Sequence, residues 1–235
     1  MIVRIGTSGY SYSEWKGKFY PARHPAGHML SYYAARFNVV EINATFYRLP
    51  SEKVLLGWAD QVPDGFTFVL KASRRITHER RLAGADEAVR SFLAAATVLG
   101  PKLGPTLFQL PPNFRKDMDR LRGFLPLIPR TWRAAFEFRH ESWFDEEVFA
   151  ALRDHNAALC INDMGEGEVN APFVSTADWG YLRLRRVAYE PGLLERWAGQ
   201  VLGQAWTDAY VFFKHEEAAT GPRLAAEFKE LIARA

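Results

Sequence analysis

The chain has 235 residues, of which 48% are hydrophobic and 14% aromatic, and this suits one α/β barrel of roughly 250 residues. Its formal charge of +3 is too small to argue for nucleic-acid binding by itself, and its single cysteine, Cys160, excludes an intramolecular disulfide. No apolar run approaches the length of a membrane span, and the start of the chain lacks a secretion-signal pattern, so we expect a cytoplasmic protein that does not enter a membrane.

Eight segments have the alternating apolar pattern of a β-strand. They begin near Val3, Val39, Phe66, Thr106, Ala134, Ala158, Gly180 and Ala209. Apolar stripes at helical spacing lie between most of them, over 30–37, 89–96, 121–128 and 224–232, and shorter helices are expected over 52–61, 145–155 and 192–202. Residues 164–178 carry no such stripe, so we expect the sixth crossover to be an irregular loop.

The alternation of strands and helices predicts parallel strands, and eight of them predict closure into a (β/α)8 TIM barrel. The alternative is an open doubly wound sheet, but no Gly-rich dinucleotide turn follows the first strand. The sequence contains no linker-like or low-complexity segment and no internal repeat. We therefore expect a single TIM-barrel domain over residues 1–235.

Polar side chains follow the apolar alternation at the far end of most strands. In the second strand, for example, Val40 and Ile42 share one face while Glu41 and Asn43 share the other. If the apolar faces pack against helices, the opposite faces line the lumen and the C-terminal mouth of the barrel, where barrel active sites lie. The side chains expected there are Ser8, Glu41, Asn43, Lys71, Gln109, Glu137, Arg139, Asn162, Arg183, Arg185 and Lys214.

Cations outnumber carboxylates on these inward faces. The cations are Arg4, Lys71, Arg139, Arg183, Arg185 and Lys214, with Arg4 nearer the amino end, and the carboxylates are Glu41 and Glu137. A buried unpaired ion is costly, so the surplus predicts either a bound phosphate or carboxylate, which arginine forks fit well, or an ion-pair network without a ligand. Backbone N–H groups of the turn after Ser8 would add donors to an anion pocket.

Six short segments form a recognisable set. They are GTSGYS (6–11), VEINATFYRLP (40–50), FTFVLK (66–71), LFQLPPNF (107–114), EFRHESW (137–143) and YLRL (181–184). In this order, over nearly the whole chain, they resemble the YecE-like proteins, a domain-of-unknown-function family, and the resemblance implies a TIM barrel without an assigned activity. Members usually carry paired asparagines after the last strand, where this chain has Lys214, His215, Glu216 and Glu217, so a ligand contact there would differ.

The candidate catalytic residues are Glu137, Glu41 and Lys71. A carboxylate among arginines and lysines keeps a low pKa, which makes Glu137 a serviceable base or metal ligand and a poor general acid. The sequence does not set the separation of the two carboxylates, so a paired-carboxylate mechanism is not predicted. Lys71 would stabilise charge or act as a nucleophile, and the amides of Asn43 and Gln109 would orient a ligand.

Two histidines directly follow strands, His140 after the fifth and His215 after the eighth. Together with Glu137, Asp163 and Glu216 they supply oxygen and imidazole groups of the kind that bind divalent metals. Their spacing matches no tight metal motif, so a divalent metal is an alternative that the sequence allows but does not indicate, and the cofactor is left unassigned. We retain His140, Asp163 and His215 as candidate ligand contacts.

Aromatic residues crowd the loops after the first, second and fifth strands. Tyr10, Tyr12 and Tyr47 are candidate contacts for a base or sugar ring above a cationic pocket. Trp15 and Trp143 are better explained as residues that pack these loops onto the barrel.

Three functions agree with these features. The first is an enzyme acting on a small anionic substrate, phosphorylated or carboxylated, with or without a sugar. The second is a nucleic-acid-binding or nucleic-acid-processing protein whose phosphate contacts would be Arg74, Arg75, Arg80 and Arg81, although such an arginine run is often only a solvated loop. The third is a sensor that binds the same anion without turnover.

Overall fold

The computed structural model describes residues 1–190, 192–215 and 217–234, in which eight parallel strands close into a barrel in chain order. The strands are β1 (Ile2–Ser8), β2 (Val39–Ile42), β3 (Thr67–Lys71), β4 (Leu103–Gln109), β5 (Ala134–Glu137), β6 (Ala158–Asp163), β7 (Trp179–Leu184) and β8 (Asp208–Phe213). β1 pairs with both β2 and β8, which closes the ring and excludes the open doubly wound sheet. The predicted (β/α)8 TIM barrel is confirmed.

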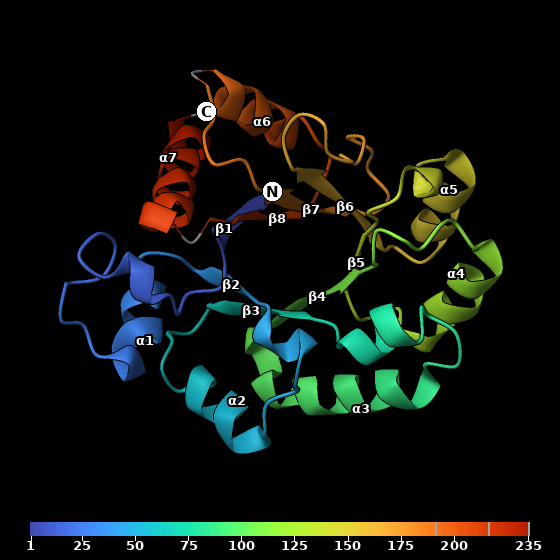
Figure 1. Cartoon of the computed structure of the whole chain (residues 1–235), viewed down its shortest axis with the longest axis horizontal. Helices are drawn as coiled ribbons and strands as arrows, with labels where there is room; N and C mark the ends of the chain where they lie inside the picture. The colour runs from blue at the N-terminus through green and yellow to red at the C-terminus, as the bar shows by residue number, and fades with distance from the viewer. Residues whose placement is uncertain (191, 216, 235) are drawn as a thin grey trace.

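Helices surround the ring of strands (Figure 1). They are α1 (Met29–Ala34), α2 (Glu52–Ala59), α3 (Asp86–Ala96), α4 (Met118–Phe124), α5 (Glu146–Asp154), α6 (Leu193–Leu202) and α7 (Thr220–Arg234). Short 3-10 or π turns are η1 (Ser13–Trp15), η2 (Ala26–His28), η3 (Ala44–Phe46), η4 (Arg75–Glu79), η5 (Thr97–Lys102), η6 (Leu125–Leu127), η7 (Glu141–Trp143) and η8 (Glu217–Ala219). Among the described residues, no helix is both long enough and apolar enough to cross a membrane.

The connection from β6 to β7, all of which is described, contains no helix, as predicted. Side chains supply hydrogen bonds that a helix would make internally. Thr176 Oγ1 accepts the N–H of Leu159 at 2.7 Å, which ties the loop to β6. The amide of Asn162 donates to the carbonyl of Val169 at 3.2 Å and accepts the N–H of Ala171 at 2.7 Å. Asn162, a residue of β6 that the sequence predicts to face the mouth, therefore fixes the irregular loop.

The alternation of side chains along the strands separates two apolar cores. Phe68 and Leu182 belong to the larger core, which lies between the strands and the surrounding helices. Val69 and Tyr181, each one residue away, belong to a smaller core inside the barrel. This is the period of two that a strand imposes, and it confirms that the apolar alternates face the helices.

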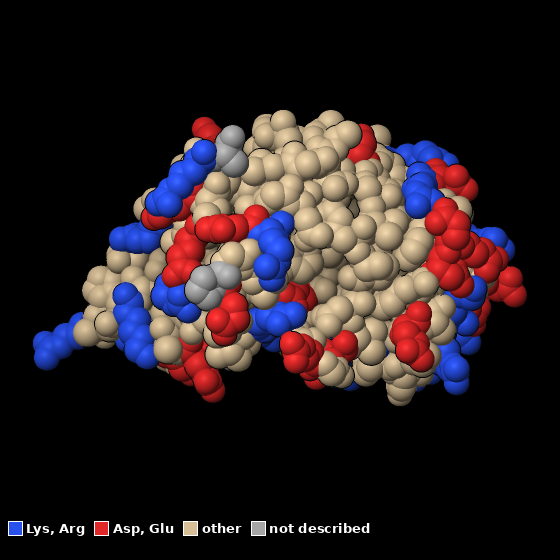
Figure 2. Space-filling view, turned by 90° about the horizontal axis from the view of Figure 1, so that it is seen from above, with Lys and Arg blue, Asp and Glu red and all other residues tan. Residues whose placement is uncertain are grey.

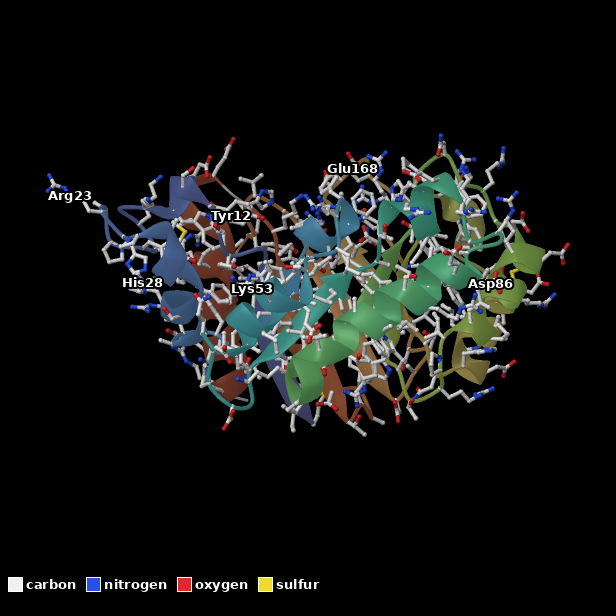
Figure 3. The ribbon with its side chains drawn as sticks, turned by 90° about the horizontal axis from the view of Figure 1, so that it is seen from below. Tyr12, Arg23, His28, Lys53, Asp86 and Glu168 are labelled. Atoms are coloured by element: carbon white, nitrogen blue, oxygen red, sulfur yellow. The ribbon has the colours of Figure 1, made fainter. Side chains whose placement is uncertain are left out.

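A polar layer lies above the inner core, toward the carboxyl ends of the strands. Moving two residues along a strand leads from Val39 to Glu41, from Val69 to Lys71, from Leu107 to Gln109, from Ala135 to Glu137 and from Tyr181 to Arg183. Loops that follow the strands rise at this same end, where Figure 3 shows Tyr12 after β1 and Glu168 after β6. The polar layer thus forms the floor of the C-terminal mouth.

The amino end of the barrel is closed by a separate ion cluster. Asp208, the first residue of β8, pairs with Arg4 of β1 and with Arg133, whose Nη2 lies 2.7 Å from Asp208 Oδ2. Arg133 Nη1 also donates to the hydroxyl of Tyr210 at 3.2 Å. Arg4 therefore lies at the amino end, as the alternation predicted.

Candidate functional site

A buried arginine joins two buried carboxylates at the centre of the mouth. Arg183, on β7, donates from Nη2 to Glu41 Oε1 at 2.8 Å and from Nη1 to Glu137 Oε2 at 2.5 Å. The exposed fraction is 2% for Arg183 and 0% for each glutamate. Because each of these ions would be costly to bury alone, their mutual contacts make the three side chains one unit that links β2, β5 and β7.

Hydrogen bonds extend this unit across β4 to Lys71 on β3. Gln109 Nε2 donates to Glu137 Oε2 at 2.9 Å, and Gln109 Oε1 accepts from Lys71 Nζ at 2.6 Å. Lys71 Nζ also lies 4.2 Å from the centre of the Phe46 ring, in a cation–π contact. On the opposite side, Arg139 Nε donates to Glu137 Oε1 at 3.0 Å. Both oxygens of Glu137 are therefore occupied by donors.

The charges of this layer give Lys71 and Glu137 different proton affinities. Burial, followed by repulsion from Arg183, lowers the pKa of Lys71 to about 8, so part of the lysine population is neutral near physiological pH. Burial alone would raise the pKa of Glu137, but Arg183 and Arg139 outweigh burial and hold this pKa well below its usual range. Glu137 is thus a permanent carboxylate, whereas Lys71 can change its protonation state.

Tyr181 belongs to the same layer, although it is absent from the residues predicted for the site. Its hydroxyl donates to Glu41 Oε2 at 2.6 Å. Burial, followed by the charge of Glu41, raises the pKa of Tyr181 well above its usual value, so the phenol stays neutral. Tyr181 lies two residues before Arg183 on the same face of β7, and this spacing is the sequence signal that identifies it.

Three further cations, Arg139, Arg185 and Lys214, are half-buried at the rim of the mouth. Arg185 Nη1 contacts the sulfur of Met164 at 3.3 Å. Burial, followed by repulsion from Arg183, lowers the pKa of Arg185. The repulsion from Arg183 shows that Arg185 lies within electrostatic reach of the buried unit.

A groove of about 460 Å³ opens between the ends of β6, β7 and β8. It is lined by Met164, Arg185, Val187, Lys214, His215 and Glu217. His215 Nε2 contacts the backbone carbonyl of Arg185, which holds the imidazole against the wall of the groove. This is the place where the sequence departs from the YecE-like pattern, and Glu216, which is part of that departure, lies outside the described residues.

Two buried polar atoms of the mouth have no hydrogen-bond partner among the described residues, Ser8 Oγ and Arg183 Nε. Ser8 is the last residue of β1 and pairs in register with Glu41 of β2. Buried polar atoms normally have partners, so these two atoms are the points where a ligand or a water molecule would bind.

The predicted aromatic contacts differ in how they are placed. Tyr47 is 73% exposed, and its ring packs edge-on against Phe46 at 5.0 Å. Tyr10 is half-buried. Tyr12 donates its hydroxyl to the carbonyl of Ser8 at 2.7 Å, so this group is turned back onto the end of β1. Of the three, Tyr47 has the ring most open to a ligand.

The loops of the mouth are packed as the sequence predicted. Trp15 and Trp143 are buried, and Trp143 Nε1 donates to the carbonyl of Phe114 at 2.7 Å. Asn43 is half-buried and directly precedes η3, the turn that carries Phe46. Asn43 therefore lies at the mouth, three residues before Phe46, whose ring covers Lys71.

Three predicted ligand contacts, Asn162, Asp163 and His140, are engaged within the fold. Asn162 holds the loop after β6. Asp163 follows it by one residue and so faces α6, from which Trp197 Nε1 donates to Oδ2 at 3.3 Å, while Oδ1 accepts from Arg186 Nε, in the loop after β7, at 2.6 Å. His140 Nδ1 accepts the N–H of Ser142 at 3.1 Å and begins η7. These contacts hold the three side chains within the fold, and their role as ligand contacts stays a prediction.

The alternative of a metal ion bound at the mouth depends on which donor side chains lie close together in the part of the chain that the structure describes. No three His, Cys, Asp or Glu side chains within that part are arranged to hold a metal ion. His140 and Asp163 have the partners given above, and His215 contacts a backbone carbonyl. Glu216, the remaining predicted ligand, is outside the described residues.

His78 lies at the mouth, although the sequence pattern gives it only a loop position. It belongs to η4, and its ring is edge-on to Phe46 at 4.8 Å. Burial, followed by the charge of Lys71, lowers the pKa of His78 to about 4, so the imidazole is neutral at physiological pH. Loops that follow strands have no side-chain period, so the sequence offers no signal that would place His78 or Phe46 beside Lys71.

The arginines predicted as phosphate contacts, Arg74, Arg75, Arg80 and Arg81, lie in and around η4. Arg74 Nε pairs with Glu79 Oε1 at 2.7 Å, and Arg81 Nη2 donates to Asn113 Oδ1 at 3.3 Å. Arg75 and Arg80 are exposed. On another side of the molecule, Figure 2 shows basic and acidic side chains intermixed rather than gathered into one basic face.

Comparisons with known protein sequences point to one family. The family model described as "Protein of unknown function DUF72" matches residues 4–235. UPF0759 protein YecE of Escherichia coli K12 is 36% identical over 116 residues, which cover 49% of this chain and 43% of YecE. UPF0759 protein YunF of Bacillus subtilis 168 is 29% identical over 190 residues, which cover 72% of this chain and 64% of YunF. The chain thus spans less than two thirds of either curated relative.

Solved structures give the same result for the fold. A DUF72 family protein from Thermotoga maritima MSB8 has a TM-score of 0.88 at 27% identity, and the match covers 99% of this chain and 100% of that chain. A DUF72 family protein from Enterococcus faecalis V583 has a TM-score of 0.81 at 19% identity, covering 99% and 98%. At that identity the second likeness concerns the fold alone.

Proposed function

The chain belongs to the DUF72 family of proteins of unknown function, and we propose that it is an enzyme acting on a small phosphorylated or carboxylated substrate at the barrel mouth. The charge of the mouth carries the proposal. Its cations are Lys71, Arg139, Arg183, Arg185 and Lys214, and its buried carboxylates are Glu41 and Glu137. Arg183 binds both carboxylates and Arg139 also binds Glu137, so five cations share two buried carboxylates, and this surplus of positive charge favours an anion brought by a ligand.

The groove beside Arg185 and Lys214 is the place where we expect the anionic group. It follows β7 and β8, a position at which barrel enzymes often hold phosphate. The guanidinium of Arg185 contacts the sulfur of Met164, a weak acceptor, so a phosphate or carboxylate would be a much stronger partner. The hydroxyl of Ser8 and Nε of Arg183 offer further donors, and Tyr47 offers a ring for a sugar-containing substrate.

The geometry favours Lys71 over the glutamates for the chemical step. A role of Glu137 as base or metal ligand stays a prediction. With donors on both oxygens and a depressed pKa, however, Glu137 is a poor proton acceptor, and we expect it to position Arg183 and Arg139. We assign the same positioning role to Glu41. Lys71, with a pKa of about 8, is better suited to exchange a proton or attack a substrate.

Thermal-shift measurements with inorganic phosphate, sugar phosphates and small carboxylates test the anion site. A ligand at about 100 times its Kd adds about 2.7 kcal/mol of stability, so we expect a raised Tm for the wild-type protein. Arg185→Gln should reduce the shift, because it removes a cation from the groove. Arg90→Gln, an exposed arginine on α3, is the matched control and should keep the full shift. The proposal fails if no anion raises the Tm, or if Arg185→Gln responds like the control.

Single-stranded nucleic acid is the second candidate ligand, because Arg75, the first residue of η4, and Arg80, which directly follows η4, are exposed in the segment after β3. Fluorescence anisotropy with labelled DNA and RNA at rising salt concentration tests this. If both arginines contact phosphates, the Arg75→Gln/Arg80→Gln double variant should reduce the salt slope by about 1.4. The absence of binding at low salt would reject this candidate.

A sensor that binds the same anion without turnover is the remaining alternative. It differs from an enzyme in the behaviour of Lys71→Met once a ligand is known. In an enzyme this variant keeps the Tm shift and loses turnover. A wild-type protein that binds the anion and never converts it would favour the sensor.

A further inference from the structure

Lys71 differs from two other partly buried lysines, Lys102 and Lys116, in what surrounds its amine. Lys116 Nζ faces the carboxylates of Asp145 and Glu147, and Lys102 Nζ lies 3.8 Å from Asp64. Among the described residues, Lys71 has no carboxylate at ion-pair distance, and its contacts are a neutral amide oxygen and an aromatic face. Losing its proton would therefore break no ion pair.

We propose that Lys71 is a nucleophile that forms an imine with an aldehyde or ketone carrying a phosphate or carboxylate. This inference rests on the proposed function, because the same mouth must hold the anionic group. It narrows the substrate from any small anion to an anionic carbonyl compound. The position of Lys71 at the end of β3 supports the assignment, since catalytic groups of barrel enzymes come from the carboxyl ends of strands.

The surroundings of Lys71 favour the neutral amine that attacks a carbonyl. Burial and the adjacent Arg183 bring its pKa to about 8, so about half of the population is unprotonated at pH 8. An amine that is desolvated and close to another cation is a recognised form of activated lysine. Gln109 Oε1 accepts one N–H of Lys71 at 2.6 Å, and this contact orients the amine.

The step balances without a further reagent. The lone pair of Lys71 Nζ bonds to the carbonyl carbon while the π electrons of the C=O bond move to oxygen. The nitrogen then gives up its two protons, the oxygen leaves with two protons as water, and a C=N bond remains. The anionic group of the substrate would lie against Arg139, Arg185 or Lys214 during this step.

Pyridoxal 5′-phosphate is the probe, because one molecule carries an aldehyde and a phosphate. The protein is incubated with the probe and reduced with sodium borohydride, whose hydride converts the imine into a stable secondary amine, and labelled lysines are identified by mass spectrometry. Lys53, exposed on α2 and labelled in Figure 3, is the internal control. The lower pKa gives Lys71 at least about 100-fold more neutral amine than an ordinary lysine at neutral pH, so even with weaker intrinsic nucleophilicity we expect about tenfold faster labelling.

Two variants connect the label to the site. Arg185→Gln should slow the labelling of Lys71, whereas Arg90→Gln should not. Lys71→Arg should abolish the label at this position and keep the Tm shift caused by inorganic phosphate. That retained shift shows that the variant folds and still binds the anion.

The outcomes separate this inference from the proposed function. A phosphate-induced Tm shift with no faster labelling of Lys71 than of Lys53 would overturn the imine and leave the anion site standing. No Tm shift together with evenly spread label would overturn both. Equal labelling of Lys71 by pyridoxal, which lacks the phosphate, would overturn the claim that the carbonyl substrate is recognised by its anion.

Discussion

Arg183 connects the two carboxylates of the mouth, so its removal has consequences beyond any ligand contact. Its two Nη groups bind Glu41 and Glu137, which are themselves fully buried. Without the guanidinium, two carboxylates from β2 and β5 would face each other in a site closed to water. Arg183 is thus required for the fold as well as for the charge of the site, and a rim arginine such as Arg185 is the cleaner probe of binding.

We expect Arg183→Met to lower the free energy of unfolding by about 3–5 kcal/mol at pH 7, because it removes the cation that both buried carboxylates share. Urea unfolding measures this change. Arg122→Met, an exposed arginine on α4 paired with Glu147, is the matched control and should change stability by about 0–1 kcal/mol.

The loss of stability caused by Arg183→Met should depend on pH. In the folded protein the pKa of Glu137 is lowered, so its ion contacts stabilise the fold above the ordinary glutamate pKa, and this stabilisation is lost as the pH falls. In Arg183→Met, Glu137 keeps Arg139 as a partner but has one cation fewer to oppose burial, so its pKa should be higher than in the wild type. The difference in the free energy of unfolding between the wild type and Arg183→Met should therefore narrow as the pH falls from 7 to 4. A difference that stays constant over this range would show that the loss comes from packing alone.

At the scale of single elements, the strands could be predicted closely because a strand fixes which face each side chain takes. β2, β5 and β6 begin at the predicted residues. β4 begins at Leu103, three residues before the predicted Thr106. Gly104 and Pro105 lack the alternating pattern, yet the backbone already pairs with β3 at Leu103, across a shift in register. Backbone pairing therefore extends a strand beyond what its side chains indicate.

Helix ends were harder to place from an apolar stripe. The stripe over residues 121–128 predicts a helix, but α4 covers Met118–Phe124 and a 3-10 turn follows it. Asp117 Oδ1 accepts the N–H of Arg120 at 3.1 Å and fixes the start. Pro126, which has no N–H, prevents the α-helix from continuing. The cap at Asp117 and the proline at residue 126, rather than the apolar stripe, therefore determine where α4 begins and ends.

The sequence predicts which side chains face the mouth, but it does not predict which of them contact one another. The period of two brings Glu41, Lys71 and Arg183 into one layer, and it would also have found Tyr181. The contact between Glu41 and Arg183 joins residues 142 apart in sequence and exists only because the sheet closes. Asp163 lies one residue beyond the inward position of Asn162 and contacts Arg186, so its role as a ligand contact stays a prediction.

Across the whole molecule, the two ends of the barrel use charge differently. At the amino end, the carboxylate of Asp208 is shared by Arg4 and Arg133, and both arginines have this acidic partner. At the carboxyl end, Arg185 and Lys214 border a groove beyond the buried carboxylates. The first arrangement is typical of a structural contact that closes β8 onto β1, and the second of a surface that binds an anion.

Substitutions at the two ends should therefore have opposite effects on stability and on binding. Asp208→Asn keeps the size of the side chain but removes the charge from two ion pairs, so we expect it to lower the free energy of unfolding by about 1–3 kcal/mol and to leave the phosphate-induced Tm shift unchanged. Arg185→Gln should reduce that shift with little loss of stability, because the guanidinium of Arg185 contacts the sulfur of Met164, which is a weak acceptor.

Urea unfolding and thermal shift on both variants test this separation. If folded Asp208→Asn lost the phosphate response, the anion site would depend on how tightly β8 closes onto β1, and not only on the cations that border the groove. If Arg185→Gln were the less stable of the two, Arg185 would belong to the ion network that holds the strands together. The retained response of the one and the retained stability of the other would together assign the amino end to folding and the carboxyl end to function.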